Sequence, residues 1–313
     1  MSVYNEPTTW MASAINSILN QSYNDFEFII VNDNPQRKDN ELFLNEFARR
    51  DNRIKILTNT VNLGLTKSLN IALKQAIGEY IARMDADDIS DQYRFEKQID
   101  FLDKNQEIGV CGSYIKTFGA AESEIKYPLK HSDCFIFFES PFAHPAVMMR
   151  KRILLQNNIS YNEALRYSQD YDLWERLYPI TKFANIPEFL LNYRINAHQI
   201  TRVRHAEQYA ISTAIKFRAF NTYCQYNGIK YQLTSPIDLR SIKDYKKNIP
   251  LSVKFNRNLF MSYIYRSIRK GKINSLIYLL LSGDFIKLGG IENSIKTIVT
   301  LAILKKKQPF LME

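Results

Sequence analysis

The sequence predicts an α/β protein with a mixed, mostly parallel sheet flanked by helices, followed by a helical C-terminal extension. Over the first 110 residues, apolar positions at helical spacing alternate with short, almost continuous apolar runs. This alternation is typical of parallel strands that are covered by helices on both faces. From about residue 205 the chain is dominated by helical patterns and is rich in Lys, Tyr and Ile. We therefore expect one domain over 1–204, with halves at about 1–110 and 111–204, and a basic helical region over 205–313.

Three helices and three strands are expected between residues 8 and 84. The helices are indicated by apolar positions at Met11, Ala14, Ile15, Ile18 and Leu19, then Leu42, Phe43 and Phe47, then Leu65, Leu69, Ala72, Leu73 and Ala76. Thr8 or Thr9 is the expected N-cap of the first helix. The strands are expected at Phe26–Val31, Ile54–Leu57 and Tyr80–Met84.

The chain is expected to open inside a strand. Ser-Val-Tyr-Asn-Glu at 2–6 reads as a strand end that turns into the first helix, with almost nothing before it. Either the start lies upstream or this first strand is unusually short.

The pattern loosens after residue 110. Strands are expected at Val110–Thr117, Ala146–Met149 and Phe189–Arg194, with a loop over 141–145 and a helix over Ser168–Leu177.

The composition argues against a membrane-spanning protein and against a small protein held together by disulfides or zinc. Of the 313 residues 45% are hydrophobic, and no apolar run approaches the roughly 18–20 residues that a membrane span needs. No secretory signal opens the chain. The three cysteines are widely spaced and odd in number, which fits neither a disulfide framework nor a zinc site. A reduced cytoplasmic compartment is expected.

The net charge of +10 is unevenly distributed. Residues 201–313 hold 20 lysines and arginines against 6 acidic residues, whereas residues 1–200 lean acidic. This asymmetry indicates an anionic partner for the C-terminal third, such as nucleic acid or an acidic membrane surface.

Three carboxylates follow the strand that ends near Met84. Asp85, Asp87 and Asp88 lie within four residues, and mutual repulsion makes such a cluster costly unless a cation compensates it. Mg²⁺ and Mn²⁺ favour carboxylate and phosphate oxygens, so a metal–diphosphate site is one interpretation. A solvated acidic turn that caps the next helix is the other. Asp33 also follows a strand, and ligands of such sheets bind where strands end, so these residues are expected to line one crevice.

Several segments together resemble a known family. They are Ser-Val-Tyr-Asn-Glu at 2–6, Asn-Asp-Asn at 32–34, Asn-Leu-Gly at 62–64, Ser-Leu-Asn at 68–70, Gly-Glu-Tyr at 78–80, Asp-Ala-Asp-Asp at 85–88 and Ser-Gln-Asp-Tyr-Asp-Leu-Trp at 168–174. In this order they resemble the inverting family 2 glycosyltransferases with the GT-A fold. The loop Pro-Phe-Ala-His-Pro at 141–145 and the Gln-Asp-Tyr-Asp-Leu-Trp form resemble the bacterial exopolysaccharide and O-antigen branch, of the amylovoran type. The resemblance covers about residues 2–200.

The resemblance implies a nucleotide-sugar site in the first, donor half of the domain. The implied donor-binding residues are Ser2, Tyr4, Glu6, Asp33, Asn62, Lys67, Asp85 and Arg194. Tyr4 would pack against the base, with core packing as its alternative. Asp33 would accept a hydrogen bond from uracil, and a turn residue is the alternative there. For Lys67 a solvated helix face is the alternative.

The resemblance also implies a divalent ion, Mn²⁺ or Mg²⁺. Asp85 would face the ribose or the metal, and Asp87 would ligate the metal, which neutralises the diphosphate leaving group. His198 is a further candidate ligand, although a lone histidine is more often structural. Asp88 could instead cap the helix that contains Phe95.

The catalytic base implied by the resemblance is Asp170, since a carboxylate must lie within reach of the attacking sugar hydroxyl. Gln169 replaces the glutamate usual at that position in the family, and Asp172 is the competing base. The acceptor residues implied in the second, acceptor half are His144, Gln169 and Trp174, with core packing the alternative for Trp174 and loop packing for His144.

The resemblance implies transfer of a sugar, from a UDP-hexose donor, to a hydroxyl of a lipid-linked saccharide acceptor in surface polysaccharide synthesis. Sugar-nucleotide synthesis is disfavoured because residues 3–9 contain no glycine for a phosphate-binding turn. The rival from another class is a non-catalytic basic protein that binds nucleic acid or a membrane surface.

The C-terminal region is expected to attach the protein to an anionic membrane surface at the cytoplasmic, inner face of the plasma membrane, and no nucleic-acid partner is expected. The basic residues Arg266, Arg269, Lys270 and Lys272 precede the apolar run Leu276–Leu281, and 305–307 is a lysine triplet. Such a pattern is typical of an interfacial helix. Ordinary core packing of Leu276–Leu281 is the alternative.

Overall fold

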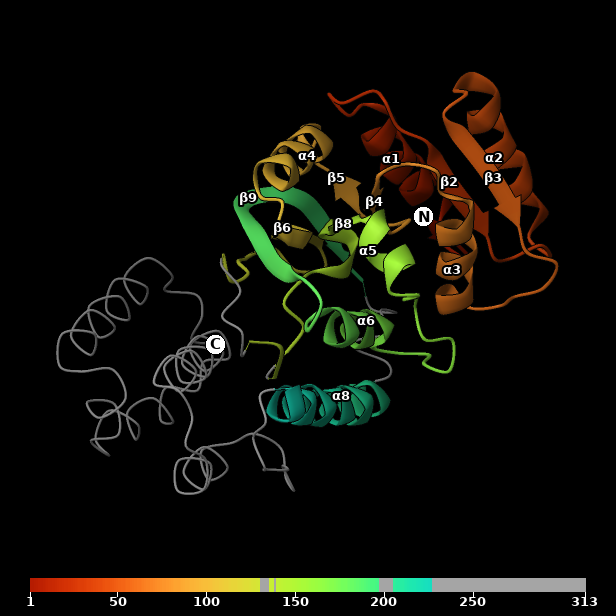
Figure 1. Cartoon of the computed structure of the whole chain (residues 1–313). Coiled ribbons are helices and arrows are strands. Elements are labelled where there is room, and N and C mark those ends of the chain that lie inside the picture. Colours follow the sequence, from red (N-terminus) through yellow and green to blue (C-terminus); the bar gives the residue numbers. More distant parts are fainter. Residues whose placement is uncertain (130–134, 138, 197–204, 227–313) are drawn as a thin grey trace. The chain divides into compact units, whose positions relative to one another are not determined.

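The computed structural model of the chain describes residues 1–129, 135–137, 139–196 and 205–226 (Figure 1). The chain forms two compact units, one of Met1–His131 with Ser140–Ile215, and one of Ser132–Glu139 with Lys216–Glu313. The basic and apolar segments expected at the membrane lie outside the described residues.

The described strands are β1 (Ser2–Val3), β2 (Phe28–Asn32), β3 (Ile54–Thr58), β4 (Tyr80–Ala82), β5 (Ile89–Ser90), β6 (Ile108–Gly119), β7 (Ser123–Ile125), β8 (Met148–Arg150) and β9 (Lys182–Ile195). The described helices are α1 (Thr8–Leu19), α2 (Lys38–Arg50), α3 (Leu65–Gln75), α4 (Arg94–Lys104), α5 (Lys151–Gln156), α6 (Gln169–Leu177) and α8 (His205–Tyr226), with short 3₁₀ turns at Phe135–Phe137 and His144–Ala146.

The β-α repeats predicted for the first half are confirmed. Strands β1, β2 and β3 form a parallel sheet in that order, with Ile30 opposite Ile56 in the β2–β3 register. All five residues of β2 are buried, as a strand covered on both faces requires. The apolar face of α1, formed by Met11, Ala14, Ile15 and Ile18, is buried. Burial of Met11, Ile15 and Ile18 contributes roughly 1.5–3 kcal/mol for each of these side chains.

The other strands form a second, mixed sheet in the order β4-β8-β6-β9-β5, with β7 paired to β6. Its pairs are antiparallel except β6–β9, which runs parallel over most of both strands. Strand β9 begins at Lys182, seven residues before the predicted start. Its register with β6 skips from Ile186 to Phe189, so Pro187 lies in a bulge, where proline is tolerated. Because proline is rare inside strands, Pro187 is the reason why the first half of this strand was not predicted from the sequence.

Several predicted element ends differ from the structure, and two of them lie close to residues of the predicted site. Neither Thr8 nor Thr9 caps α1, because the helix begins at Thr8 and the residue before it is Pro7, whose carbonyl oxygen accepts bonds from Trp10 and Met11. Strand β4 ends at Ala82 instead of Met84. Arg83 and Met84 therefore belong to the loop that carries the acidic cluster.

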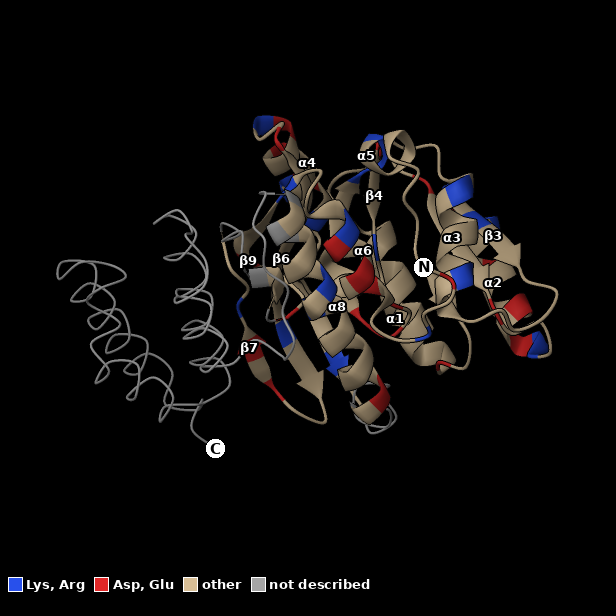
Figure 2. Ribbon diagram, turned by 60° about the horizontal axis from the view of Figure 1, so that its bottom comes forward, with Lys and Arg blue, Asp and Glu red and all other residues tan. Residues whose placement is uncertain are grey.

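Charged residues of both signs are interspersed on α4, α6 and α8 (Figure 2). No helix within the described part of the chain combines the length and the hydrophobicity that crossing a membrane requires.

Candidate functional site

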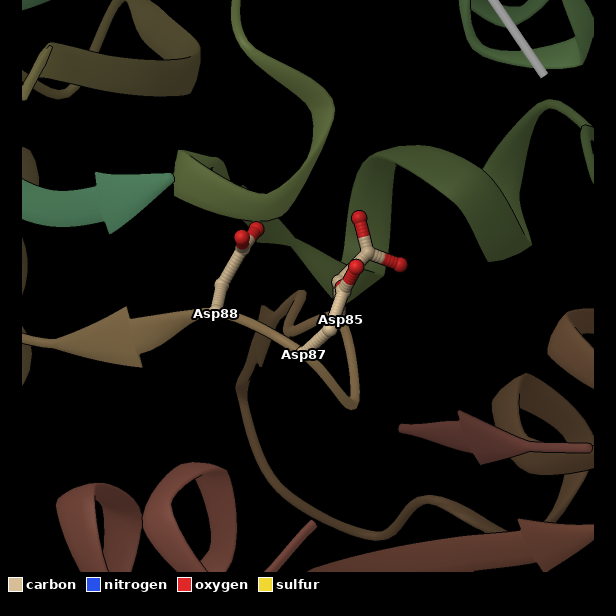
Figure 3. A group of neighbouring side chains, drawn as sticks. All are labelled: Asp85, Asp87 and Asp88. Atoms are coloured by element: carbon tan, nitrogen blue, oxygen red, sulfur yellow. The ribbon is translucent and has the colours of Figure 1, made fainter. Parts of the chain in front are cut away.

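The acidic cluster lies in the loop between β4 and β5. One carboxylate oxygen from each of Asp85, Asp87 and Asp88 lies within 4.8 Å of the others. The three side chains rise from the same side of the loop (Figure 3). This is the spacing that a single divalent ion can bridge.

The surroundings of this cluster disfavour negative charge. Burial, and then the charges of Asp85 and Glu6, raise the pKa of Asp87 to about 7. Burial and the charges of Asp85 and Asp87 raise the pKa of Asp88 well above its usual range. A cation would relieve both effects, because it offsets the lost solvation and the repulsion together.

A buried arginine compensates part of this charge. Arg83 is 5% exposed and forms an ion pair with Asp85. Its Nε atom has no hydrogen-bond partner among the described residues. The charge of Arg83 also lowers the pKa values of Asp87 and Asp170. Sequence reasoning missed this residue, although a single arginine in an otherwise apolar stretch was a usable signal.

Arg194, near the end of β9, braces the acidic loop. Its backbone N–H donates to Asp88 Oδ1 at 2.7 Å, and its Nε donates to the carbonyl oxygen of Asp87 at 2.8 Å. The guanidinium carbon lies 4.5 Å from the ring centre of Trp10 and 4.4 Å from that of Phe118. Flat packing against two rings suits a guanidinium and not an ammonium. Trp10 and Phe118 gave no functional signal in the sequence.

The residues present fit a divalent ion. Asp87 is half-buried and carries a destabilised charge, and the buried Asp88 Oδ2 has no partner among the described residues. The alternative in which Asp88 caps the next helix is wrong. Helix α4 begins at Arg94 after Tyr93, without a side-chain cap. His198 lies outside the described residues.

The predicted base stands at the start of α6. Asp170 is half-buried in the first helical turn, where the helix dipole favours a carboxylate. Burial nevertheless raises the pKa of Asp170; backbone N–H groups and Arg83 oppose this rise, while Asp85 adds to it. The residue that precedes the helix, Ser168, has left-handed backbone angles (φ 55°, ψ 24°), which are strained for a residue with a side chain. Gln169 is buried.

Two other residues of α6 have structural partners. Asp172, the competing base, is buried and its Oδ2 accepts from Arg176 Nε at 2.9 Å. The indole of Trp174 has no exposed surface and packs edge-on against Phe142, with ring centres 5.2 Å apart. For Trp174 this is the core-packing alternative.

His144 and Tyr161 form a buried polar pair. His144 Nε2 lies 2.7 Å from Tyr161 Oη. Burial, and then the charge of Arg83, lower the pKa of His144, so that its ring is neutral near pH 7. Burial raises the pKa of Tyr161, and the charge of Asp170 adds to that rise. Tyr161 is a site residue that the sequence did not indicate.

Asp33 organises the Asn-Leu-Gly loop. Its Oδ1 accepts from Asn59 Nδ2 and from the Leu63 N–H, and its Oδ2 accepts from the Gly64 N–H, all at 2.8 Å. Gly64 has φ 84°, a conformation that favours glycine. A carboxylate offers about four acceptor positions, and these bonds use three of them. Asn62 in this loop is exposed.

The remaining donor candidates surround the first turn of the chain. Tyr4 is 42% exposed, and its N–H donates to Glu6 Oε2 at 2.7 Å. Burial raises the pKa of Glu6. Ser2 is half-buried in β1, and Lys67 is exposed on α3.

The sequence matches a family model described as "Glycosyl transferase family 2" over residues 1–174. The O-antigen biosynthesis glycosyltransferase WbnJ of Escherichia coli is 34% identical over 229 residues, which is 69% of this chain and 89% of that protein. The amylovoran biosynthesis glycosyltransferase AmsE of Erwinia amylovora is 28% identical over 284 residues, 87% of this chain and 98% of that protein. A UDP-Gal:alpha-D-GlcNAc-diphosphoundecaprenol beta-1,3-galactosyltransferase of E. coli is 28% identical over 277 residues, 86% of this chain and 94% of that protein.

Solved structures match the fold. TarS 1–349 of S. aureus, in complex with UDP-GlcNAc, gives a TM-score of 0.55 at 16% identity, covering 86% of this chain and 91% of that one. The mannosyltransferase PcManGT of Pyrobaculum calidifontis, in complex with GDP-Man and Mn²⁺, gives 0.54 at 12% identity, covering 99% and 86%. The GT-A fold that the sequence predicts is thereby confirmed.

Proposed function

Because the chain belongs to glycosyl transferase family 2, we propose that it transfers a sugar from a UDP-linked donor, with inversion, to a hydroxyl of a lipid-linked saccharide. Membership in an enzyme family sets aside the non-catalytic rival. The observation that carries the proposal is the acidic loop, in which Asp87 and Asp88 offer oxygens for a metal while the charges of Asp85 and Arg83 act on the candidate base Asp170.

Asp87 and Asp88 would hold Mn²⁺ or Mg²⁺, with Asp85 facing the ribose or the metal. The bound ion supplies positive charge that stabilises the departing diphosphate. Arg194 keeps the loop in place through its contacts with Asp87 and Asp88. The mannosyltransferase structure named above contains Mn²⁺, which is the ion we favour.

Asp170 would take the proton of the attacking hydroxyl. A single displacement requires the base on the side opposite the leaving group, and a raised pKa makes Asp170 a stronger base than an exposed aspartate. His144 and Gln169 belong to the acceptor side in this scheme. The buried Trp174 would support them without touching the acceptor sugar.

The donor side would use Tyr4 to pack against the base and the fourth acceptor position of Asp33 for the uracil N–H. Ser2, Glu6, Asn62 and Lys67 would surround the nucleoside and its phosphates. UDP is favoured over GDP because the E. coli galactosyltransferase is named for the donor UDP-Gal, and TarS was solved with UDP-GlcNAc.

The acceptor class is proposed from the relatives. The E. coli galactosyltransferase is named for a GlcNAc-diphosphoundecaprenol acceptor, and AmsE is named for amylovoran biosynthesis. On this basis we propose a role in surface polysaccharide synthesis at the cytoplasmic face of the plasma membrane.

A donor screen tests this function. Slow hydrolysis of UDP-Glc, UDP-Gal, UDP-GlcNAc, UDP-GalNAc and GDP-Man is compared in Mn²⁺ and in chelator. We expect Mn²⁺-dependent turnover of at least one UDP-sugar, with inverted configuration of the first product by NMR. Retention of configuration, or equal turnover in Mn²⁺ and in chelator, would contradict the proposal.

Attachment to a membrane surface is proposed from the sequence of the C-terminal third. Each Lys or Arg near an anionic surface contributes about 1 kcal/mol, so a handful gives reversible binding. The full chain should co-sediment with phosphatidylserine-containing vesicles and lose this binding as salt rises. Absence of binding at low salt would contradict the proposed attachment to a membrane surface.

A further inference from the structure

Arg94 is a fully buried arginine at the first position of α4, where the helix dipole disfavours a cation. Within the described residues, its guanidinium donates to two carbonyl oxygens and a sulfur atom, and to no carboxylate. Burial lowers the pKa of Arg94 to about 10, so the side chain still carries its charge near pH 7. Because a buried cation is costly and an apolar side chain would pack there without that cost, the hydrogen-bond partners of Arg94 indicate what it contributes.

The two carbonyl oxygens belong to parts of the candidate site that lie far apart in the sequence. Arg94 Nη2 donates to the Arg83 carbonyl oxygen at 2.9 Å, where the acidic loop begins. Arg94 Nη1 donates to the Pro145 carbonyl oxygen at 2.8 Å, within the 3₁₀ turn that begins at His144. The same nitrogen lies 3.8 Å from Met84 Sδ in the acidic loop. One guanidinium therefore joins the acidic loop to the residue that follows His144.

A second buried side chain of α4 holds the same turn but does not reach the acidic loop. Gln98 lies one helical turn after Arg94 and is fully buried. Its Nε2 donates to the Ala146 carbonyl oxygen at 2.9 Å. Gln98 thus supports the His144 turn alone, whereas Arg94 supports the turn and the acidic loop together. This difference separates the two residues experimentally.

The geometry of the guanidinium makes this link rigid. Its nitrogens are fixed in one plane, so two bonds from the Nη atoms also fix the separation of the two carbonyl oxygens. In the proposed function the acidic loop holds the metal and the diphosphate, and His144 belongs to the acceptor side. Sugar transfer needs both substrates in a near-attack arrangement, and a misplacement of about 1 Å can cost about 10²-fold in rate.

We propose that Arg94 is a positioning residue that holds the acidic loop and the His144 turn at a fixed separation, and so keeps the donor and acceptor sides aligned. Arg94 touches neither substrate in this scheme. The inference rests on the proposed function for what the two sides bind. The link itself is a property of the free chain and is tested without a substrate.

Arg94→Met tests this link, and Gln98→Met is the matched control. Methionine keeps an unbranched side chain but donates no hydrogen bond. Both substitutions remove a buried donor from α4 and leave a carbonyl oxygen of the His144 turn unpaired, but only Arg94→Met also releases the acidic loop. Amide hydrogen exchange over 84–88 and 143–147 is measured in the free chain and in both variants. Each protein is then titrated with UDP in Mn²⁺ and in chelator by calorimetry.

Arg94→Met should speed exchange at least about tenfold over both segments, and Gln98→Met over 143–147 alone. The UDP affinity in Mn²⁺ should fall about tenfold or more in Arg94→Met and stay within about twofold in Gln98→Met, with binding in chelator unchanged in both. A loss of stability alone would not give this pattern, because unfolded molecules lower the binding stoichiometry and leave the affinity of the folded ones unchanged.

Unchanged exchange over 84–88 in Arg94→Met, or an equal increase there in Gln98→Met, overturns the proposal. So does a UDP affinity in Mn²⁺ that is unchanged in Arg94→Met or lowered equally in both variants. If Arg94→Met does not fold, Arg94→Lys replaces it, with the same pattern expected at about threefold or more, and its absence overturns the proposal. Failure of the unmodified chain to bind UDP in Mn²⁺ contradicts the proposed function instead, and the exchange data still decide whether Arg94 links the two loops.

Discussion

Asp87 and Asp170 are both held where negative charge is poorly solvated, but their neighbours differ. Asp87 lies beside other carboxylates, and repulsion from Asp85 and Glu6 adds to the effect of burial on its pKa. Asp170 receives backbone hydrogen bonds and the favourable charge of Arg83. The first environment suits a cation and the second suits a base that must stay ionised but reactive.

Replacement of Asp170 by Asn should separate chemistry from binding. The amide keeps the size of the side chain but cannot accept the proton, so turnover should fall by about 10²–10⁴. The UDP affinity should hardly change, because the residue is assigned to the acceptor side. Steady-state kinetics and UDP calorimetry measure the two effects.

Asp172→Asn is the matched control for this substitution. Its carboxylate pairs with Arg176, so the variant should lose stability while a folded sample keeps near-normal turnover. Full activity in Asp170→Asn together with a large loss in Asp172→Asn would reassign the base.

The raised pKa of Asp170 also predicts a pH dependence. The base must be deprotonated, so kcat/KM should fall as pH falls through a pKa that lies above the ordinary aspartate range near 4. Activity is therefore complete on the alkaline side of this limb and lost on the acidic side. The residual rate of Asp170→Asn should lack the limb, and a limb of unchanged position in that variant would assign it to another group.

Arg194→Lys tests whether this residue braces the acidic loop or contacts the donor. Lysine keeps the charge but cannot pack flat between Trp10 and Phe118 while donating to the Asp87 carbonyl. Bracing predicts that UDP affinity falls about tenfold or more in Mn²⁺ and is unchanged in chelator, as for residues that orient metal ligands. An equal loss in both conditions would indicate direct contact with the diphosphate. The exposed Arg50→Lys serves as control.

At the scale of elements, helix α3 connects the proposed donor side to the proposed acceptor side through buried polar residues. Asn70 exchanges hydrogen bonds with the backbone of Tyr161 at 2.9 Å in both directions. Ser68 accepts from Asn59, which also donates to Asp33. The Ser-Leu-Asn motif thus has a structural role that its resemblance alone did not specify.

Asn70→Ala should destabilise the fold by about 1–3 kcal/mol, because it leaves buried backbone groups of Tyr161 unpaired. Chemical denaturation measures this free energy of unfolding. Asn16→Ala, at an exposed position on α1, is the control and should change it by less than about 0.5 kcal/mol. Similar effects of the two substitutions would mean that the α3 connection does not support the fold.

At the scale of the whole molecule, the sequence predicted the elements that repeat locally and missed those that depend on distant contacts. The helices from Thr8 to Gln75 and strands β2 and β3 follow from periodicity. The pairing of β6 with β9, and the bulge at Pro187, depend on residues far apart in the chain.

The residues of the candidate site likewise fall into two groups, those that the sequence indicated and those that it missed. Asp33, Asp85 and Asp87 were indicated because carboxylates at strand ends are conspicuous, and Asp170 was indicated by the resemblance to the family. Arg83, Tyr161 and the Trp10–Arg194–Phe118 stack were missed, since buried cations and aromatic rings resemble ordinary core residues in a sequence. Only the folded chain shows which charges they face.

The central claim is that Asp87 ligates an ion that bridges the donor diphosphate, and UDP calorimetry tests it most directly. The chain and its Asp87→Ala variant are each titrated with UDP in Mn²⁺ and in chelator. UDP should bind the unmodified chain much more tightly in Mn²⁺, and Asp87→Ala should erase that difference while binding in chelator stays equal. Equal, metal-independent binding of UDP to both proteins would contradict the claim.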